Sequence, residues 1–119
     1  MDIMERIGLL LQCGFSDKED YDDLCKIISI FRDDFKIELT EENSGVMITH
    51  MAAAFKRNTT GEEISPLDES VFEDVEDSDM YALANEIVTK IESGIENRIT
   101  GEERKFFLLH ICTLLDKVS

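Results

Sequence analysis

Apolar residues recur at three- and four-residue steps along most of this chain, which is the period of an amphipathic helix. The first such stripe lies in residues 3–14 and ends at Gly14, and others follow in residues 21–35, 41–57, 81–94 and 99–118. No segment keeps up the alternation of apolar and polar residues that a half-buried β-strand shows. The sequence therefore predicts an all-α fold, a compact bundle of about five helices.

Capping patterns mark where several of these helices should begin. Thr40 precedes the third stripe, and a threonine there can accept a hydrogen bond from the first turn of a helix. Ser16 with Glu19, and Thr100 with Glu103, fit the capping box, in which both side chains bond to backbone N–H groups at the helix start. These positions predict starts for the second, third and last helices.

The middle of the chain gives weaker signals. Proline is tolerated in the first helical turn because its missing N–H is not needed there, so Ser65-Pro66 predicts the start of a short helix. From Asp68 to Asp79 there are seven acidic residues and no basic one, and we interpret this run as a solvated connection. No proline- or glycine-rich linker divides the chain, so residues 1–119 are expected to form a single domain.

The charge balance limits the partners that this chain can bind directly. It has 27 acidic and 12 basic residues, a formal net charge of -15 at pH 7. Such a surface repels phosphate backbones and anionic lipid, so no direct binding of nucleic acid or membrane is expected. An acidic mimic of nucleic acid stays open as a third interpretation that rests on charge alone.

Three cysteines, an odd number, argue against a disulfide framework. We expect Cys13, Cys25 and Cys112 to be small buried apolar residues in a reducing compartment. The N-terminus has no basic region before its apolar residues, and no apolar stretch approaches the roughly 20 residues that a membrane span needs. The protein is expected to be cytoplasmic.

The two histidines lie in two helical segments about sixty residues apart. His50 lies in GVMITHMAAAFKR, with Arg57 two helical turns later, and His110 lies in TGEERKFFLLHI, preceded by Glu103 and Phe106. Both segments resemble the signatures of the PTS regulation domain (PRD). This family comprises all-α modules of bacterial antiterminators and transcription activators that the sugar phosphotransferase system controls. The resemblance is strongest over residues 45–119.

The resemblance implies functions for specific residues. His110 and His50 would be phosphoacceptors, Arg57, Lys56 and Lys105 would be candidates for contacting the phosphate, and Glu103 would be a candidate for supporting His110. In the family an aspartate that can orient the imidazole often precedes the first histidine, whereas this chain has Thr49 there. Partners would be a phosphocarrier or permease domain of the phosphotransferase system, a PRD-containing regulator, and a second copy in a homodimer.

Simpler interpretations exist for the same residues. By itself His110 reads as a hydrogen-bonded core histidine, Arg57 as a surface ion-pair residue and Glu103 as part of a capping box. Neither HxxxH nor CxxC occurs, so no metal site, cofactor or enzymatic activity is predicted. We expect a regulatory domain that acts through histidine phosphorylation. The alternative is a PRD-like interaction module that is not phosphorylated and dimerises with a full-length regulator.

Overall fold

Residues 1–118 are described by the computed structural model, and they form α-helices joined by short segments, with no strand among them. The helices are α1 (Ile3–Gln12), α2 (Lys18–Phe35), α3 (Glu41–Thr60), α4 (Glu69–Glu76), α5 (Tyr81–Gly94) and α6 (Gly101–Val118). The predicted all-α fold is confirmed. The described residues contain six helices, close to the predicted number of about five, and α4 is the short helix expected in this part of the chain, although it begins at Glu69.

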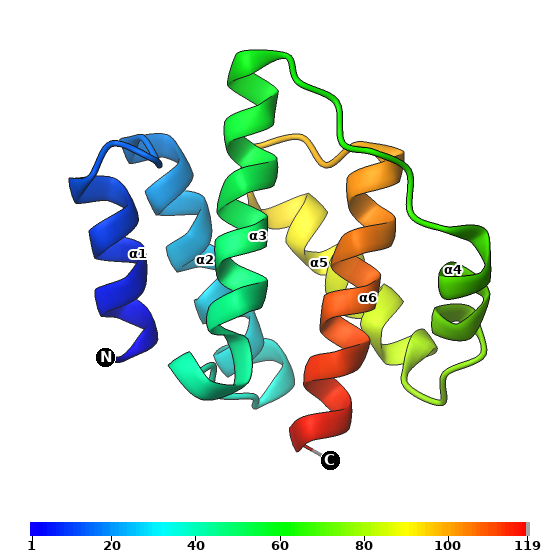
Figure 1. Cartoon of the computed structure of the whole chain (residues 1–119). Coiled ribbons are helices and arrows are strands. Elements are labelled where there is room, and N and C mark those ends of the chain that lie inside the picture. Colours follow the sequence, from blue (N-terminus) through cyan, green and yellow to red (C-terminus); the bar gives the residue numbers. More distant parts are fainter. Residues whose placement is uncertain (119) are drawn as a thin grey trace.

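Helices α3 and α6 lie side by side and antiparallel in the middle of the molecule (Figure 1). Helices α1 and α2 pack against α3 on one side, and α5 and α4 pack against α6 on the other. Helix α5 also contacts α2, which closes the bundle. The two helices that carry the histidines are therefore held by neighbours, so the histidines sit on a rigid base.

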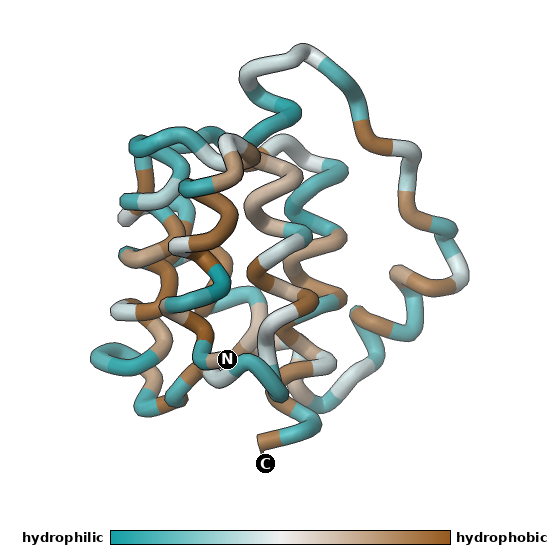
Figure 2. The backbone as a smooth tube through the Cα atoms, turned by 60° about the vertical axis from the view of Figure 1, so that its left-hand side comes forward, coloured by the Kyte–Doolittle hydropathy of each residue, from teal (hydrophilic) through white to brown (hydrophobic). Residues whose placement is uncertain are grey.

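The core follows the helical period that the sequence shows. Figure 2 shows apolar and polar residues interspersed along the helices. The buried apolar residues of these helices form one core cluster, as expected of amphipathic helices. Helix α6 buries Phe107, Ile111 and Leu115 at four-residue steps. On α3, Ala52 is fully buried, and its small side chain lets neighbouring helices approach closely. The largest fully buried side chains are Phe31, Phe55, Ile7, Leu24, Ile27, Ile48, Met51, Ile87, Ile91, Leu108, Ile111 and Leu114.

The helix starts confirm one predicted cap and correct another. The hydroxyl of Thr40 accepts the N–H of Asn43, whose side chain accepts the N–H of Thr40, so α3 begins as predicted. The cap of α2 is Asp17, not Ser16. Aspartate caps as well as serine does, and the helix begins one residue later than expected. Ser16 is buried instead.

The segment between α3 and α5 also differs from the prediction. Pro66 does not start a helix, because residues 61–68 cross without helical structure from the end of α3 over the start of α6 to α4 (Figure 1). Helix α4 begins after Asp68, whose carboxylate accepts the N–H of Ser70. The acidic run is not simply a solvated connection, since most of it is α4, which buries Val75.

A buried carboxylate fixes the connection that leads into α6. Asp23 of α2 accepts the N–H groups of Glu96 and Asn97 at 3.0 and 2.8 Å. The side chain of Asn58 on α3 donates to the carbonyl of Arg98 at 2.7 Å. These bonds tie residues 95–100 to both α2 and α3, and they set the position at which α6 starts.

The three cysteines differ in their exposure. Cys112 is buried and Cys25 is half-buried, but Cys13 is exposed at the end of α1, so the expectation of three buried cysteines is wrong for Cys13. All three are free. No helix within residues 1–118 combines the length and the apolar character needed to cross a membrane.

Candidate functional site

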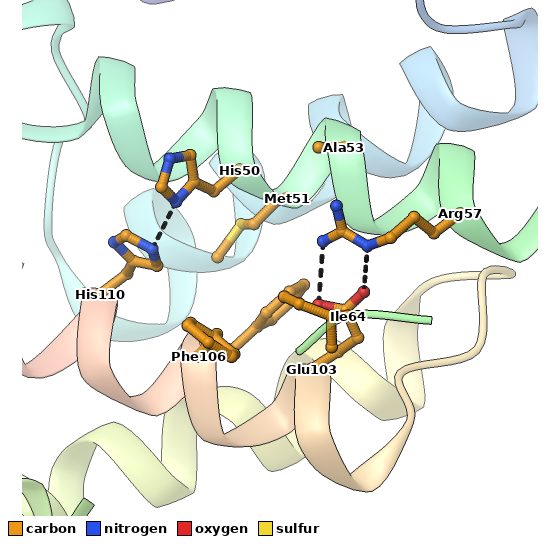
Figure 3. A pocket seen from close by; sticks show the side chains of 9 residues that line it. His50, Met51, Ala53, Arg57, Ile64, Glu103, Phe106 and His110 are labelled. Carbon is orange, nitrogen blue, oxygen red and sulfur yellow. Dashed lines mark hydrogen bonds and ion pairs between the residues drawn. The ribbon is translucent and has the colours of Figure 1, made fainter. Parts of the chain in front are cut away.

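The two histidines face one another across the contact between α3 and α6 (Figure 3). Nδ1 of His50 lies 2.8 Å from Nε2 of His110, which is hydrogen-bonding distance. The ring centroids are 4.6 Å apart, and the ring planes are nearly perpendicular at 85°. The packing of α3 on α6 thus joins two residues sixty positions apart into one hydrogen-bonded pair.

The two rings differ in their exposure. His50 is exposed, whereas His110 is half-buried. Burial, and secondarily the nearby ring of His50, lower the pKa of His110 from 6.5 to about 4. His110 is therefore uncharged at neutral pH, and its ring then has one nitrogen that carries a proton and one that carries a lone pair.

About two helical turns from the histidines, Arg57 and Glu103 form a second bridge between α3 and α6. Nε and Nη2 of Arg57 donate to the two carboxylate oxygens of Glu103 at 2.8 and 3.1 Å. The side chain of Glu103 is 8% exposed and that of Arg57 is 25% exposed. A bidentate ion pair whose side chains are largely shielded from solvent fixes both side chains more firmly than a surface ion pair does.

Glu103 thus has a different partner from the one that its sequence context predicts. Its backbone N–H donates to the hydroxyl of Thr100 at 3.4 Å, as in a capping box. Its carboxylate binds Arg57 instead of returning to the start of the helix, so only half of the predicted box forms. The described hydrogen bonds of its carboxylate go to Arg57 and not to His110, although both residues line the same cavity.

A cavity of about 280 Å³ separates the histidine pair from the ion pair. Its two ends are polar, and its middle is apolar (Figure 3). The residues around it are His50, Met51, Ala53, Arg57, Ile64, Glu103, Phe106, Phe107 and His110. A space of this size can hold a small polar group between its two polar ends.

The structure does not bring all the predicted phosphate contacts together. Arg57 borders the cavity, but Lys56 and Lys105 do not. The ammonium group of Lys56 lies over the ring of Phe15, at 4.6 Å from its centroid. That of Lys105 lies 5.3 Å from the ring centroid of Phe72 and 3.5 Å from a carboxylate oxygen of Glu102.

Thr49, the residue before the first histidine, is engaged elsewhere. Its hydroxyl donates to the carbonyl of Gly45 at 2.9 Å and accepts from Arg6 at 3.2 Å. Arg6 is held in turn by the carboxylate of Glu41, at 2.8 and 2.7 Å from Nε. In this chain His50 takes its ring partner from the opposite helix rather than from the preceding residue.

Sequence reasoning did not find every residue of the site. The pairing of His50 with His110 needs the register of α3 against α6, which local periodicity does not give. Ile64 borders the cavity from the non-helical segment between α3 and α4. Its one signal in the sequence is that it is apolar within a mostly polar stretch.

The arrangement suits nucleophilic chemistry at a ring nitrogen. An uncharged imidazole with one nitrogen held by a hydrogen bond can attack through the other. No group of three potential ligands gathers anywhere in residues 1–118 in a way that could hold a metal ion.

Comparison with known proteins identifies the class of domain to which this site belongs. Residues 25–113 match the family model of the PRD domain, which is the greater part of the chain, and the chain belongs to this family. The match begins earlier than the stretch over which the motifs are recognisable, since it takes in most of α2.

The chain is also similar to the uncharacterized protein YhfY of Escherichia coli (strain K12). The two are 29% identical over 73 residues, which is 61% of this chain and 61% of that protein. No solved structure matches the chain significantly.

Proposed function

We propose that this protein is a regulatory domain of the phosphotransferase system that accepts a phosphoryl group at the His50–His110 pair. The observation that carries the proposal is the pair itself, with two imidazoles at 2.8 Å beside a cavity that Arg57 borders. Membership in the PRD domain family supports it. The donor would be a protein of that system carrying a phosphohistidine, a phosphocarrier or a permease domain.

The phosphoryl group would act as a switch through its charge. It adds about -1.5 to -2 charges by analogy with hydroxyl phosphorylation. The chain already has a net charge of -15, and Arg57 is the cation that borders the cavity. A surface that includes this site would be repelled by an acidic partner and attracted by a basic one after phosphorylation. The domain would in this way alter its association with a second copy or with a PRD-containing regulator in the cytoplasm.

The experiment is phosphorylation with a purified phosphotransferase relay and radiolabelled phosphoenolpyruvate. The expected product is labelled protein whose label is lost in acid, as N–P bonds require, and retained in alkali. The chain has only two histidines, so the double variant His50→Ala/His110→Ala offers no imidazole and is the matched control. Equal labelling of the wild type and this variant would refute the proposal.

The consequence for assembly needs a separate measurement. Sedimentation of the phosphorylated and unphosphorylated protein reports whether copies associate and whether the phosphoryl group changes this. An absence of label in the wild type, combined with binding to a full-length regulator that both histidine variants retain, would favour the unphosphorylated interaction module.

A further inference from the structure

We infer that the two histidines have unequal tasks: His50 accepts the phosphoryl group through Nε2, and His110 is a positioning residue that holds the Nδ1 proton of His50. This inference rests on the proposed function and specifies how its site operates. It follows from three observations about the pair, which are the identity of the bonded nitrogens, the number of protons available, and the exposure of each ring.

The bonded nitrogens determine which ring can attack. The bond joins Nδ1 of His50 to Nε2 of His110, so one of these atoms donates and the other accepts. If His50 donates, its lone pair is on Nε2, which in Figure 3 faces away from His110. If His110 donates, the lone pair that remains is on its own Nδ1, and Nε2 of His50 carries a proton and cannot attack. With both rings uncharged, only one of them is a nucleophile at any moment.

The exposure of the rings favours His50 in this choice. His50 is exposed to solvent where α3 meets α6, whereas His110 is half-buried. A donor phosphohistidine on another protein must place its phosphorus in line with the attacking nitrogen, and an exposed ring allows that approach. His110 is uncharged at neutral pH, so in one of its two tautomers Nε2 has a lone pair that can accept the proton of His50.

The transfer step balances without another reactant. The lone pair on Nε2 of His50 forms the new N–P bond, while the N–P bond of the donor breaks and its electrons return to the donor imidazole. The proton on Nδ1 of His50 remains in the hydrogen bond to His110, which shares the positive charge that the phosphorylated ring gains. The hydroxyl of Thr49 is hydrogen-bonded to Gly45 and Arg6. The ring of His50 is therefore oriented by its hydrogen bond to His110 and not by the preceding residue.

Two measurements test the inference, and the first needs no phosphodonor. Nitrogen-15 NMR of the histidine rings in the free protein should show the proton of His50 on Nδ1 and a lone pair on its Nε2. A proton found on Nε2 of His50 would overturn the inference and would leave the proposed function standing.

The second measurement compares labelling of single variants by the relay. His50→Ala should abolish the label, and NMR of the phosphorylated wild type should place the phosphorus on Nε2. His110→Leu should slow labelling by about tenfold or more because the ring of His50 loses its partner. His110→Gln should recover most of the rate, because its amide oxygen comes close to the former position of Nε2 and can accept the same proton.

The outcomes separate this inference from the proposed function. Label that survives His50→Ala, or that lies on His110 in the wild type, would overturn the inference while confirming a phosphoacceptor site. Equal rates for His110→Leu and the wild type would show that His110 has no positioning role. An unlabelled wild type refutes the proposed function, and the inference falls with it even where the NMR result agrees.

Discussion

The guanidinium of Arg57 is held by the carboxylate of Glu103 in two hydrogen bonds, at 2.8 and 3.1 Å, across the cavity from the histidine pair. Arg57 and His50 are on the same helix, two turns apart, which is a rise of about 10.5 Å. A long side chain that leans toward the N-terminus of its helix shortens this gap. In this structure the partner of Arg57 is Glu103, and we expect a phosphoryl group on His50 to compete with Glu103 for the guanidinium.

Release of Arg57 should favour the phosphorylated protein. Glu103→Gln removes the competing charge, so Arg57 becomes free to contact the phosphoryl group. A hydrogen bond between charged groups contributes about 1.5–3 kcal/mol, and about 1.4 kcal/mol corresponds to a tenfold change in an equilibrium constant. We expect the equilibrium ratio of phosphorylated to unphosphorylated protein to rise about tenfold in Glu103→Gln. Arg57→Gln is the matched control and should lower it; no change in either variant would exclude Arg57 as a phosphate partner.

The stability of the protein should fall in mild acid because of His110. Its pKa is about 4 in the folded protein and near 6.5 in the unfolded chain, so between these values the unfolded chain binds more protons. Stability from this group is complete above pH 6.5 and is lost as the pH falls toward 4. Because the ring is only half-buried, we expect a loss of about 1 kcal/mol at pH 5.

Urea denaturation of the wild type and of His110→Gln at pH 7 and pH 5 isolates this contribution. The carboxylates titrate equally in both proteins, so their effects cancel in the difference. The wild type should lose about 1 kcal/mol more than the variant between the two pH values. Identical losses would show that His110 takes up its proton equally well in the folded and unfolded chains.

Features that depend on residues close together in the sequence could be predicted, whereas features that depend on packing between helices could not. The stripe of Phe107, Ile111 and Leu115 depends on positions four apart, so local spacing was enough to predict a buried helix face. The cap of α2 was misplaced by one residue because Ser16 and Asp17 are both good caps, and only packing decides between them.

In the candidate site, too, the sequence indicates individual residues but not how residues of different helices pair. Both histidines and Arg57 were identified from their motifs, but the bond between His50 and His110 depends on how α3 and α6 are aligned. Glu103 has two possible uses for its carboxylate, the start of its own helix and Arg57 on another. The sequence spacing indicates only the bond to the start of its own helix, whereas in the structure the carboxylate binds Arg57.

The buried carboxylate of Asp23 should be among the more important polar groups for stability. It accepts two backbone N–H groups and the side-chain amide of Asn97 at 2.7 Å. Asp23→Ala would leave these donors without partners, and we expect a loss of about 2–4 kcal/mol. Asp22→Ala, the neighbouring exposed position, removes only a surface ion pair with Lys18 and should cost less than about 1 kcal/mol. Chemical denaturation of both variants checks the difference, and similar costs would contradict the anchoring role of Asp23.

Lys36 offers a stabilising change, since it ends α2 in a left-handed conformation with φ 58° and ψ 35°. In the left-handed conformation the Cβ of any residue other than glycine crowds the backbone, at a cost of about 1–2 kcal/mol. Glycine is therefore the usual residue at this position. Lys36→Gly also makes the unfolded chain more flexible, which offsets part of the gain. We expect a net increase in stability of about 0.5–1 kcal/mol. The same change at Lys26, an exposed position inside α2, should lower stability by about 1 kcal/mol, because there glycine only adds freedom to the unfolded chain. Opposite signs in thermal denaturation would identify backbone strain as the cause, whereas a loss in both variants would show that Lys36 contributes more through its side chain than its conformation costs.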